Sequence, residues 1–117
     1  MLLHGHDEIA VEKLEKCHNG VGAYEVRTLF ETEFGSGMKY IRELVLNPGA
    51  TIGIHPHAGD EEIYYVVSGQ GEMIVDDEKR SVKPGDAVLT KSGSRHGLNN
   101  PTDNDLKIFV VCASVDD

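Results

Sequence analysis

The sequence predicts an all-β fold, a sandwich or barrel of short strands. Alternating or continuous apolar stretches recur along most of the chain, and turn residues separate them. Glycine is frequent, with 13 of 117 residues, as in small chains that contain many tight turns. The composition, 39% hydrophobic and 26% charged, is that of a globular chain and excludes a disordered one. The length suits one domain with one core.

Three strands are expected before the histidine-rich middle of the chain. Tyr24–Phe30 alternates apolar and charged residues, which is typical of a strand with one buried face. Lys39–Leu46 is a longer strand, and the turn residues Asn47–Pro48–Gly49 end it. Thr51–His55 follows directly and is rich in β-branched residues. These elements predict successive strands joined by short turns.

Six shorter strands are expected in the rest of the chain, separated by turns such as Ser68–Gly69–Gln70–Gly71 and Lys83–Pro84–Gly85. We expect the apolar side chains of Met38, Phe109 and Val111 to lie in the core. The six strands are Glu62–Val67, Glu72–Val75, Arg80–Val82, Asp86–Thr90, His96–Leu98 and Lys107–Ala113. Nine short strands at close spacing indicate a sandwich or barrel.

Residues 1–20 leave two alternatives. Asp7 could cap a helix whose apolar side is Ala10, Leu14 and Cys17, ended by Gly20. The same residues could form an extended arm, which is favoured because every other segment predicts a strand. We therefore expect residues 1–20 to be an N-terminal arm or short helix, and residues 21–115 to be a single barrel domain.

The charge of the chain argues against several classes of partner. With 20 acidic and 11 basic residues the net charge is −9, which disfavours binding to nucleic acid or to an anionic membrane surface. The longest apolar run, Ile108–Ala113, is too short to span a membrane, and residues 1–6 lack the pattern of a secretory signal. Cys17 and Cys112 do not form a metal or redox motif. We expect a soluble, cytoplasmic protein that binds neither nucleic acid nor membranes.

Histidine is the residue type that points to chemistry. His55 and His57 lie two residues apart at the end of an expected strand, so their side chains share one face. A carboxylate follows in Glu61–Glu62, and His96 begins another expected strand. Three imidazoles and one carboxylate form a complete ligand set for a transition metal. Glu61 and Glu62 are alternative sources of the carboxylate.

Two stretches have the spacing of known sequence motifs. Residues 49–69 follow the pattern G-x5-H-x-H-x4-E-x6-G, in which only Glu62 keeps six residues before the final glycine. Residues 85–100 follow G-x5-K-x-G-x2-H-x3-N, with Lys91 where the usual pattern has proline. Over roughly residues 39–113 the chain therefore resembles the cupin superfamily, in particular the small single-domain cupins, and distantly the oxalate decarboxylases.

The resemblance implies a jelly-roll barrel, or double-stranded β-helix, in which one divalent metal is bound by His55, His57, Glu62 and His96. Ligands of this kind favour Mn²⁺ or Fe²⁺, with Ni²⁺, Co²⁺ or Zn²⁺ as alternatives. It also implies a homodimer, in which a strand within residues 8–17 could be exchanged between subunits. Related enzymes include decarboxylases, dioxygenases, lyases and isomerases. A non-enzymatic module that binds a sugar or another small ligand is the alternative.

Three residues are candidates for substrate binding. Tyr64 shares a strand face with Glu62, so it is expected to face the barrel interior, in core packing or in contact with substrate. Tyr40 and Arg42 share one face of their strand; inside the barrel Arg42 could bind an anionic substrate, and outside it would pair with surface acids.

The residues that directly precede the histidine pair differ from those of the oxalate decarboxylases. Oxalate decarboxylases carry an arginine just before their histidine pair, where this chain has Ile52–Gly53–Ile54. The difference favours a partly apolar substrate, or requires Arg42 to bind the anion. His4, His6 and His18 are expected to be terminal or turn residues without a ligand role.

Overall fold

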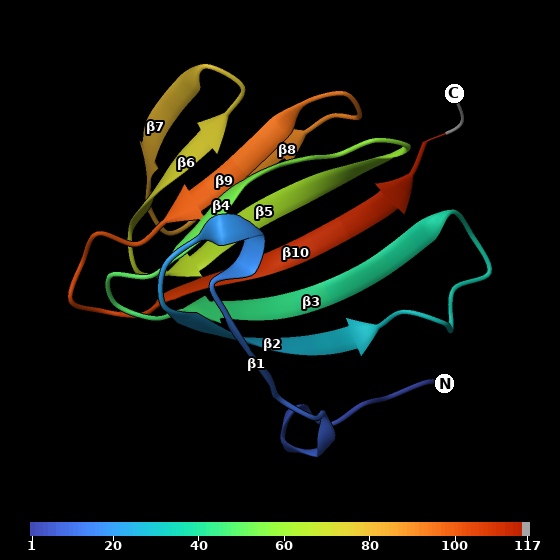
Figure 1. Ribbon diagram of the computed structural model, residues 1–117. Coiled ribbons are helices and arrows are strands. Elements are labelled where there is room, and N and C mark those ends of the chain that lie inside the picture. Colours follow the sequence, from blue (N-terminus) through green and yellow to red (C-terminus); the bar gives the residue numbers. More distant parts are fainter. Residues whose placement is uncertain (116–117) are drawn as a thin grey trace.

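The computed structural model describes residues 1–115, which form ten strands in two antiparallel sheets (Figure 1). In spatial order, the six-stranded sheet contains β1 (Glu12–Glu15), β2 (Ala23–Phe30), β3 (Met38–Leu46), β10 (Leu106–Ser114), β5 (Asp60–Ser68) and β8 (Ala87–Thr90). The four-stranded sheet contains β4 (Thr51–Pro56), β9 (Arg95–Asn99), β6 (Gly71–Val75) and β7 (Glu78–Val82). The all-β barrel expected from the sequence is confirmed.

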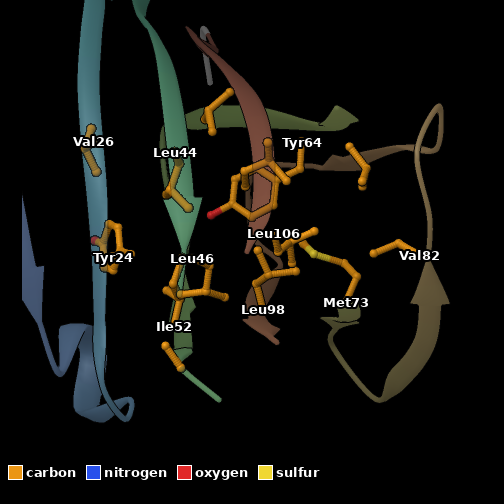
Figure 2. Close-up of a cluster of buried hydrophobic side chains, with 14 residues drawn as sticks. Tyr24, Val26, Leu44, Leu46, Ile52, Tyr64, Met73, Val82, Leu98 and Leu106 are labelled. Carbon is orange, nitrogen blue, oxygen red and sulfur yellow. The ribbon is translucent and has the colours of Figure 1, made fainter. Parts of the chain in front are cut away.

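The hydrophobic core lies between the two sheets, because each strand turns alternate side chains inward. In β10, Leu106, Ile108, Val110 and Cys112 are all buried. Figure 2 shows the main contributors from the other strands: Tyr24, Val26, Leu44, Leu46, Ile52, Tyr64, Met73, Val82 and Leu98. Both sheets therefore contribute to one core.

The other face of β10 corrects part of the sequence prediction. Phe109 and Val111 alternate with the buried residues, so they lie half-buried on the outer face of the six-stranded sheet. There they neighbour Ile63 and Tyr65 of β5, which are 40% and 44% exposed. Met38 is also only half-buried, at the start of β3. The prediction that these three apolar side chains lie in the core was wrong.

The first twenty residues are extended, with two short 3₁₀ turns and no α-helix. Turn η1 covers His6–Glu8, and turn η2 covers Cys17–Asn19. Between them β1 pairs antiparallel with β2 of the same chain, with Leu14 opposite Tyr24. The structure thus contains one strand more than the nine expected, and the nine agree with their predicted ranges to within about two residues.

The turns between strands rest on glycine where the chain must bend sharply. Gly69, between β5 and β6, has φ of 82° and packs against the carbonyl oxygen of Asp105 so closely that a side chain would overlap it. Cys17 and Cys112 are free thiols. Among residues 1–115, no helix has the length and apolar character needed to cross a membrane.

Candidate metal centre

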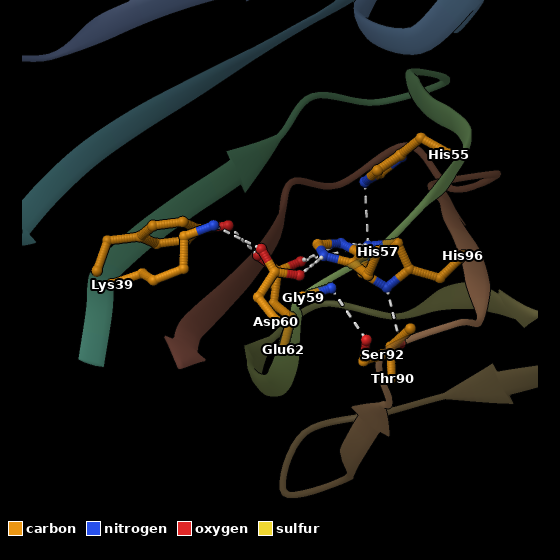
Figure 3. A network of polar contacts seen from close by, with 10 residues as sticks. Lys39, His55, His57, Gly59, Asp60, Glu62, Thr90, Ser92 and His96 are labelled. Atoms are coloured by element: carbon orange, nitrogen blue, oxygen red, sulfur yellow. Dashed lines mark hydrogen bonds and ion pairs between the residues drawn. The ribbon is translucent and has the colours of Figure 1, made fainter. Parts of the chain in front are cut away.

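Three strands bring the expected ligand residues together (Figure 3). β4 pairs antiparallel with β9, and this register sets His55 directly opposite His96. His57 follows the end of β4, and Glu62 lies on the inward face of β5. His57, Glu62 and His96 are buried, whereas His55 is half-buried. Residues 41 positions apart in sequence thus meet at one point inside the barrel.

The imidazoles of His55, His57 and His96, called here the histidine cluster, converge through their Nε2 atoms. The Nε2 atom of His96 lies 2.9 Å from that of His57 and 3.1 Å from that of His55. Ligand atoms of the three residues all lie within 4.8 Å of one another, so the cluster can hold a metal ion. Oε1 of Glu62 lies 3.3 Å from Nε2 of His57 and 3.2 Å from Nε2 of His96.

The Nδ1 atom of each imidazole has a partner of its own. Nδ1 of His55 donates to the carbonyl oxygen of Gly53 at 2.8 Å, and Nδ1 of His57 donates to the carboxylate of Asp60 at 2.7 Å. Since these partners only accept, a neutral imidazole at His55 or His57 carries its lone pair on Nε2. Nδ1 of His96 lies 2.8 Å from the hydroxyl of Thr90, which can donate or accept and so permits either tautomer.

A cation satisfies this arrangement. Around Nε2 of His96, the imidazoles of His55 and His57 offer lone pairs and Glu62 offers a carboxylate oxygen, so an N–H of His96 or a metal ion at their meeting point would satisfy them. The observed Nε2 separations of 2.9 and 3.1 Å are short enough for these nitrogens to bind one metal at about 2.1 Å each. The residues present therefore fit a divalent transition metal.

Buried charges around the cluster are paired. Asp60 accepts from His57 and also pairs with Nζ of Lys39 at 2.7 Å. Burial opposes the charge of Asp60, but these two contacts outweigh it and hold the pKa of Asp60 below its ordinary value. Glu62 behaves alike: burial opposes its charge, whereas hydrogen bonds from His96 and Tyr40 lower its pKa. Both carboxylates are therefore ionised at neutral pH.

His55 and His57 of the histidine cluster line a cavity of about 670 Å³. Tyr40, Arg42 and Tyr64, the expected substrate contacts, all line this cavity together with His55 and Glu62. The guanidinium of Arg42 stacks over the ring of Tyr40 at 3.7 Å from its centroid, and Nε of Arg42 donates to Thr28 at 3.2 Å. Arg42 therefore lines the cavity, but its side chain is 33% exposed and a terminal nitrogen lies 3.9 Å from Oε1 of the exposed Glu31, which lines the same cavity.

The hydroxyls of Tyr40 and Tyr64 stay protonated. Burial is the main cause that raises the pKa of each, and the neighbouring charge of Glu62 adds to it. Tyr40 uses its proton to donate to the carboxylate of Glu62. The ring of Tyr64 lies 4.9 Å from that of His96. These tyrosines are neutral donors beside the cluster.

Two other histidines lie away from the cluster, and two polar residues beside it were not predicted from the sequence. His4 and His6 pair with Glu33 and Glu43 on the surface, as their terminal position suggested. Asp60 and Thr90 were missed, because sequence spacing does not reveal which side chains reach Nδ1 of a histidine. The one signal in the sequence was an aspartate three residues after a candidate ligand, His57.

Comparison with known proteins agrees with this geometry. Residues 42–112 match the family model described as Cupin domain. An "Oxalate-binding protein" of Thermotoga maritima is 30% identical over 89% of this chain and 87% of its own length. A crystal structure described as a predicted oxalate decarboxylase from Thermotoga maritima has a TM-score of 0.92, with 28% identity over 97% of this chain and 100% of the other. A Cupin 2 conserved barrel domain protein from Salinispora arenicola shares the fold, with a TM-score of 0.75 and 24% identity over 98% and 90%.

Proposed function

Because the chain belongs to the cupin family, we propose that it binds one divalent transition metal through His55, His57, Glu62 and His96 and acts there on a small, oxygen-rich acid. The observation that carries the proposal is the histidine cluster, whose Nε2 atoms converge beside the Glu62 carboxylate on the wall of a cavity. Nitrogen and oxygen ligands without thiolate favour Mn²⁺ or Fe²⁺, with Ni²⁺, Co²⁺ and Zn²⁺ as alternatives.

When bound, such a metal supplies Lewis acidity to an oxygen of a chelating substrate. The surrounding residues would do the rest. Arg42 is the cationic side chain on the cavity wall and would bind a carboxylate of the substrate. The neutral hydroxyl of Tyr64 could donate to a substrate oxygen, while Tyr40 orients Glu62. The apolar side chains of Ile52 and Val26 line the same cavity and would keep water from the reacting group.

The substrate class follows from the cavity and from the relatives. Oxalate and related acids carry carboxylate or keto groups that can chelate a metal, and Arg42 on the cavity wall would bind their remaining negative charge. A relative is named an oxalate-binding protein, and oxalate is therefore the first acid to test. A decarboxylase, a dioxygenase or a lyase could each use the Lewis acidity that a bound metal would supply. A non-enzymatic binding module is the second candidate, because the same relative is named for binding oxalate and not for a reaction.

Metal-loaded protein mixed with carbon-13-labelled oxalate, pyruvate and malonate separates these candidates. Calorimetry measures binding, and carbon NMR follows loss of substrate. An enzyme should consume one of the acids, and a binding module should bind one without forming product. If metal-loaded protein neither binds nor consumes any of these acids, the proposed substrate class fails.

Three further expectations belong to this proposal. The chain is proposed to form a homodimer and to reside in the cytoplasm. Its division into an N-terminal arm, residues 1–20, and a barrel domain, residues 21–115, is proposed as well. Size-exclusion chromatography with light scattering would test the homodimer, limited proteolysis would test the division, and fractionation of the source cells would test the location.

A further inference from the structure

His18 contacts the histidine cluster although it lies outside residues 42–112, which match the cupin model. Its ring stacks on that of His55 with centroids 3.7 Å apart and planes 13° from parallel. His18 also lines the cavity. The contact comes from η2, the turn that follows β1 in the blue part of Figure 1 and lies against β4.

The backbone at and after η2 is held against β4 by two hydrogen bonds and by two close glycine contacts. The amide of Val21 donates to Oγ1 of Thr51 at 2.8 Å, and the amide of Thr51 donates to the carbonyl of Val21 at 2.7 Å. A Cβ atom on Gly53 would overlap the carbonyl oxygen of His18, and one on Gly20 would overlap that of Thr51. Glycine at position 53 therefore makes room for the turn.

His55 needs more support than the other two histidines. His57 and His96 are buried, and packing fixes their rings, whereas His55 is only half-buried. The hydrogen bond from Nδ1 of His55 to Gly53 fixes the ring at its edge. His18 covers a face of the same ring and limits its rotation. The two contacts together hold Nε2 of His55 toward the cluster.

We propose that His18 is a positioning residue for the metal ligand His55: its stacked ring sets the plane of the His55 imidazole, so that metal affinity depends on the N-terminal turn. The inference rests on the proposed metal site. Residues that orient a metal ligand typically contribute about 10- to 100-fold in metal affinity. A partly exposed stacking contact falls at the lower end, about tenfold.

Two substitutions distinguish the effect of the stacked His18 ring from the effect of its nitrogen atoms. His18 has φ of 54°, a conformation that asparagine tolerates well, so His18→Asn removes the ring with little backbone strain. His18→Phe keeps an aromatic face and lacks ring nitrogens. We expect His18→Asn to bind Co²⁺ about tenfold more weakly than the wild type, and His18→Phe to remain within about twofold. His4→Asn, at a surface histidine paired with Glu33, is the matched control and should bind as the wild type.

Two readouts are needed. The visible absorption of bound Co²⁺ gives the affinity and reports the geometry of its ligands. In metal-free protein, NMR of the ring protons of His55 reports the stack itself, since a stacked aromatic ring shields them; His18→Asn should move them downfield. If His18→Phe does not fold, His18→Tyr replaces it, because this change also keeps an aromatic face without ring nitrogens. It should bind Co²⁺ within about twofold of the wild type.

Each outcome decides the question. Co²⁺ affinity of His18→Asn within twofold of the wild type would overturn the inference and leave the metal site standing. Equal weakening in His18→Asn and a folded His18→Phe would also overturn it, because a ring nitrogen, not the stacked face, would then matter. No Co²⁺ binding by the wild type would remove the proposed metal site and this inference with it.

Discussion

Asp60 offers a sharp test of the metal centre, because it lies next to a proposed ligand and is not one itself. Its carboxylate accepts from Nδ1 of His57 at 2.7 Å and is buried, with 8% of the residue exposed. Asp60→Asn keeps the shape and an accepting oxygen but removes the charge that makes His57 a strong donor to a metal. We expect weaker metal binding with an intact fold.

The size of the effect can be worked out for thermal unfolding. A ligand at 100 times its Kd stabilises the native state by about 2.7 kcal/mol. At about 2.1 cal/mol/K per residue, the unfolding entropy of this chain is about 0.25 kcal/mol/K, so the wild-type Tm should rise by about 11 °C. Metal affinity about 10- to 100-fold lower leaves about 1.4 to 0.4 kcal/mol of stabilisation. The rise in Asp60→Asn should then be about 6 to 2 °C.

Circular dichroism melts with and without Mn²⁺ measure this difference. Each variant is compared with its own metal-free form, so the lost pairing of Asp60 with the half-exposed Lys39 cancels. Asp103→Asn, in the exposed loop after β9, is the matched control and should keep the wild-type rise. A metal-dependent rise in Asp60→Asn equal to that of the wild type would refute the argument that Asp60 supports a metal ligand.

Three other changes test separate parts of the site. Glu62→Gln removes a proposed ligand charge, so Mn²⁺ affinity in calorimetry should fall by more than the roughly tenfold expected for an outer contact; an unchanged Kd would exclude Glu62 as a ligand. Arg42→Ala should weaken oxalate binding to metal-loaded protein about tenfold, the loss of one charged hydrogen bond, with metal affinity unchanged; equal oxalate affinity would place the anion elsewhere. Burial lowers the pKa of His55 from 6.5 to about 4, so the unfolded chain binds more protons between these values. Urea unfolding of metal-free protein should therefore show stability lost as pH falls through 6.5 toward 4, and His55→Asn should show a shallower loss; an identical slope would contradict the burial of His55.

The strands and the histidine cluster could be predicted because their signals are local. Alternation along β2 and turn residues such as Asn47–Pro48–Gly49 need no tertiary knowledge. The two motifs, one with His55, His57 and Glu62 and the other with His96, have fixed spacing because the barrel fixes the pairing of β4 with β9 and of β5 with β8. The spacing of the first motif also predicts a turn at Gly69, and Gly69 has the positive φ of such a turn.

Other features depend on contacts that no local pattern carries. β1 is charged at Glu12, Lys13 and Glu15 and buries little, as edge strands do, so it has no apolar alternation. β10 is apolar on both faces, so its sequence does not reveal that Val110 points inward and Phe109 outward. The stack of His18 on His55 and the bond between Thr90 and His96 join residues that only the folded barrel brings together.

The metal content of the protein tests the central claim most directly. Protein loaded anaerobically with Mn²⁺ or Fe²⁺, freed of excess metal and measured by elemental analysis should contain about one ion per chain. His96→Ala, which removes the imidazole at the centre of the cluster, should retain far less under the same treatment. A wild-type protein without metal, or a variant that retains as much as the wild type, would contradict the account.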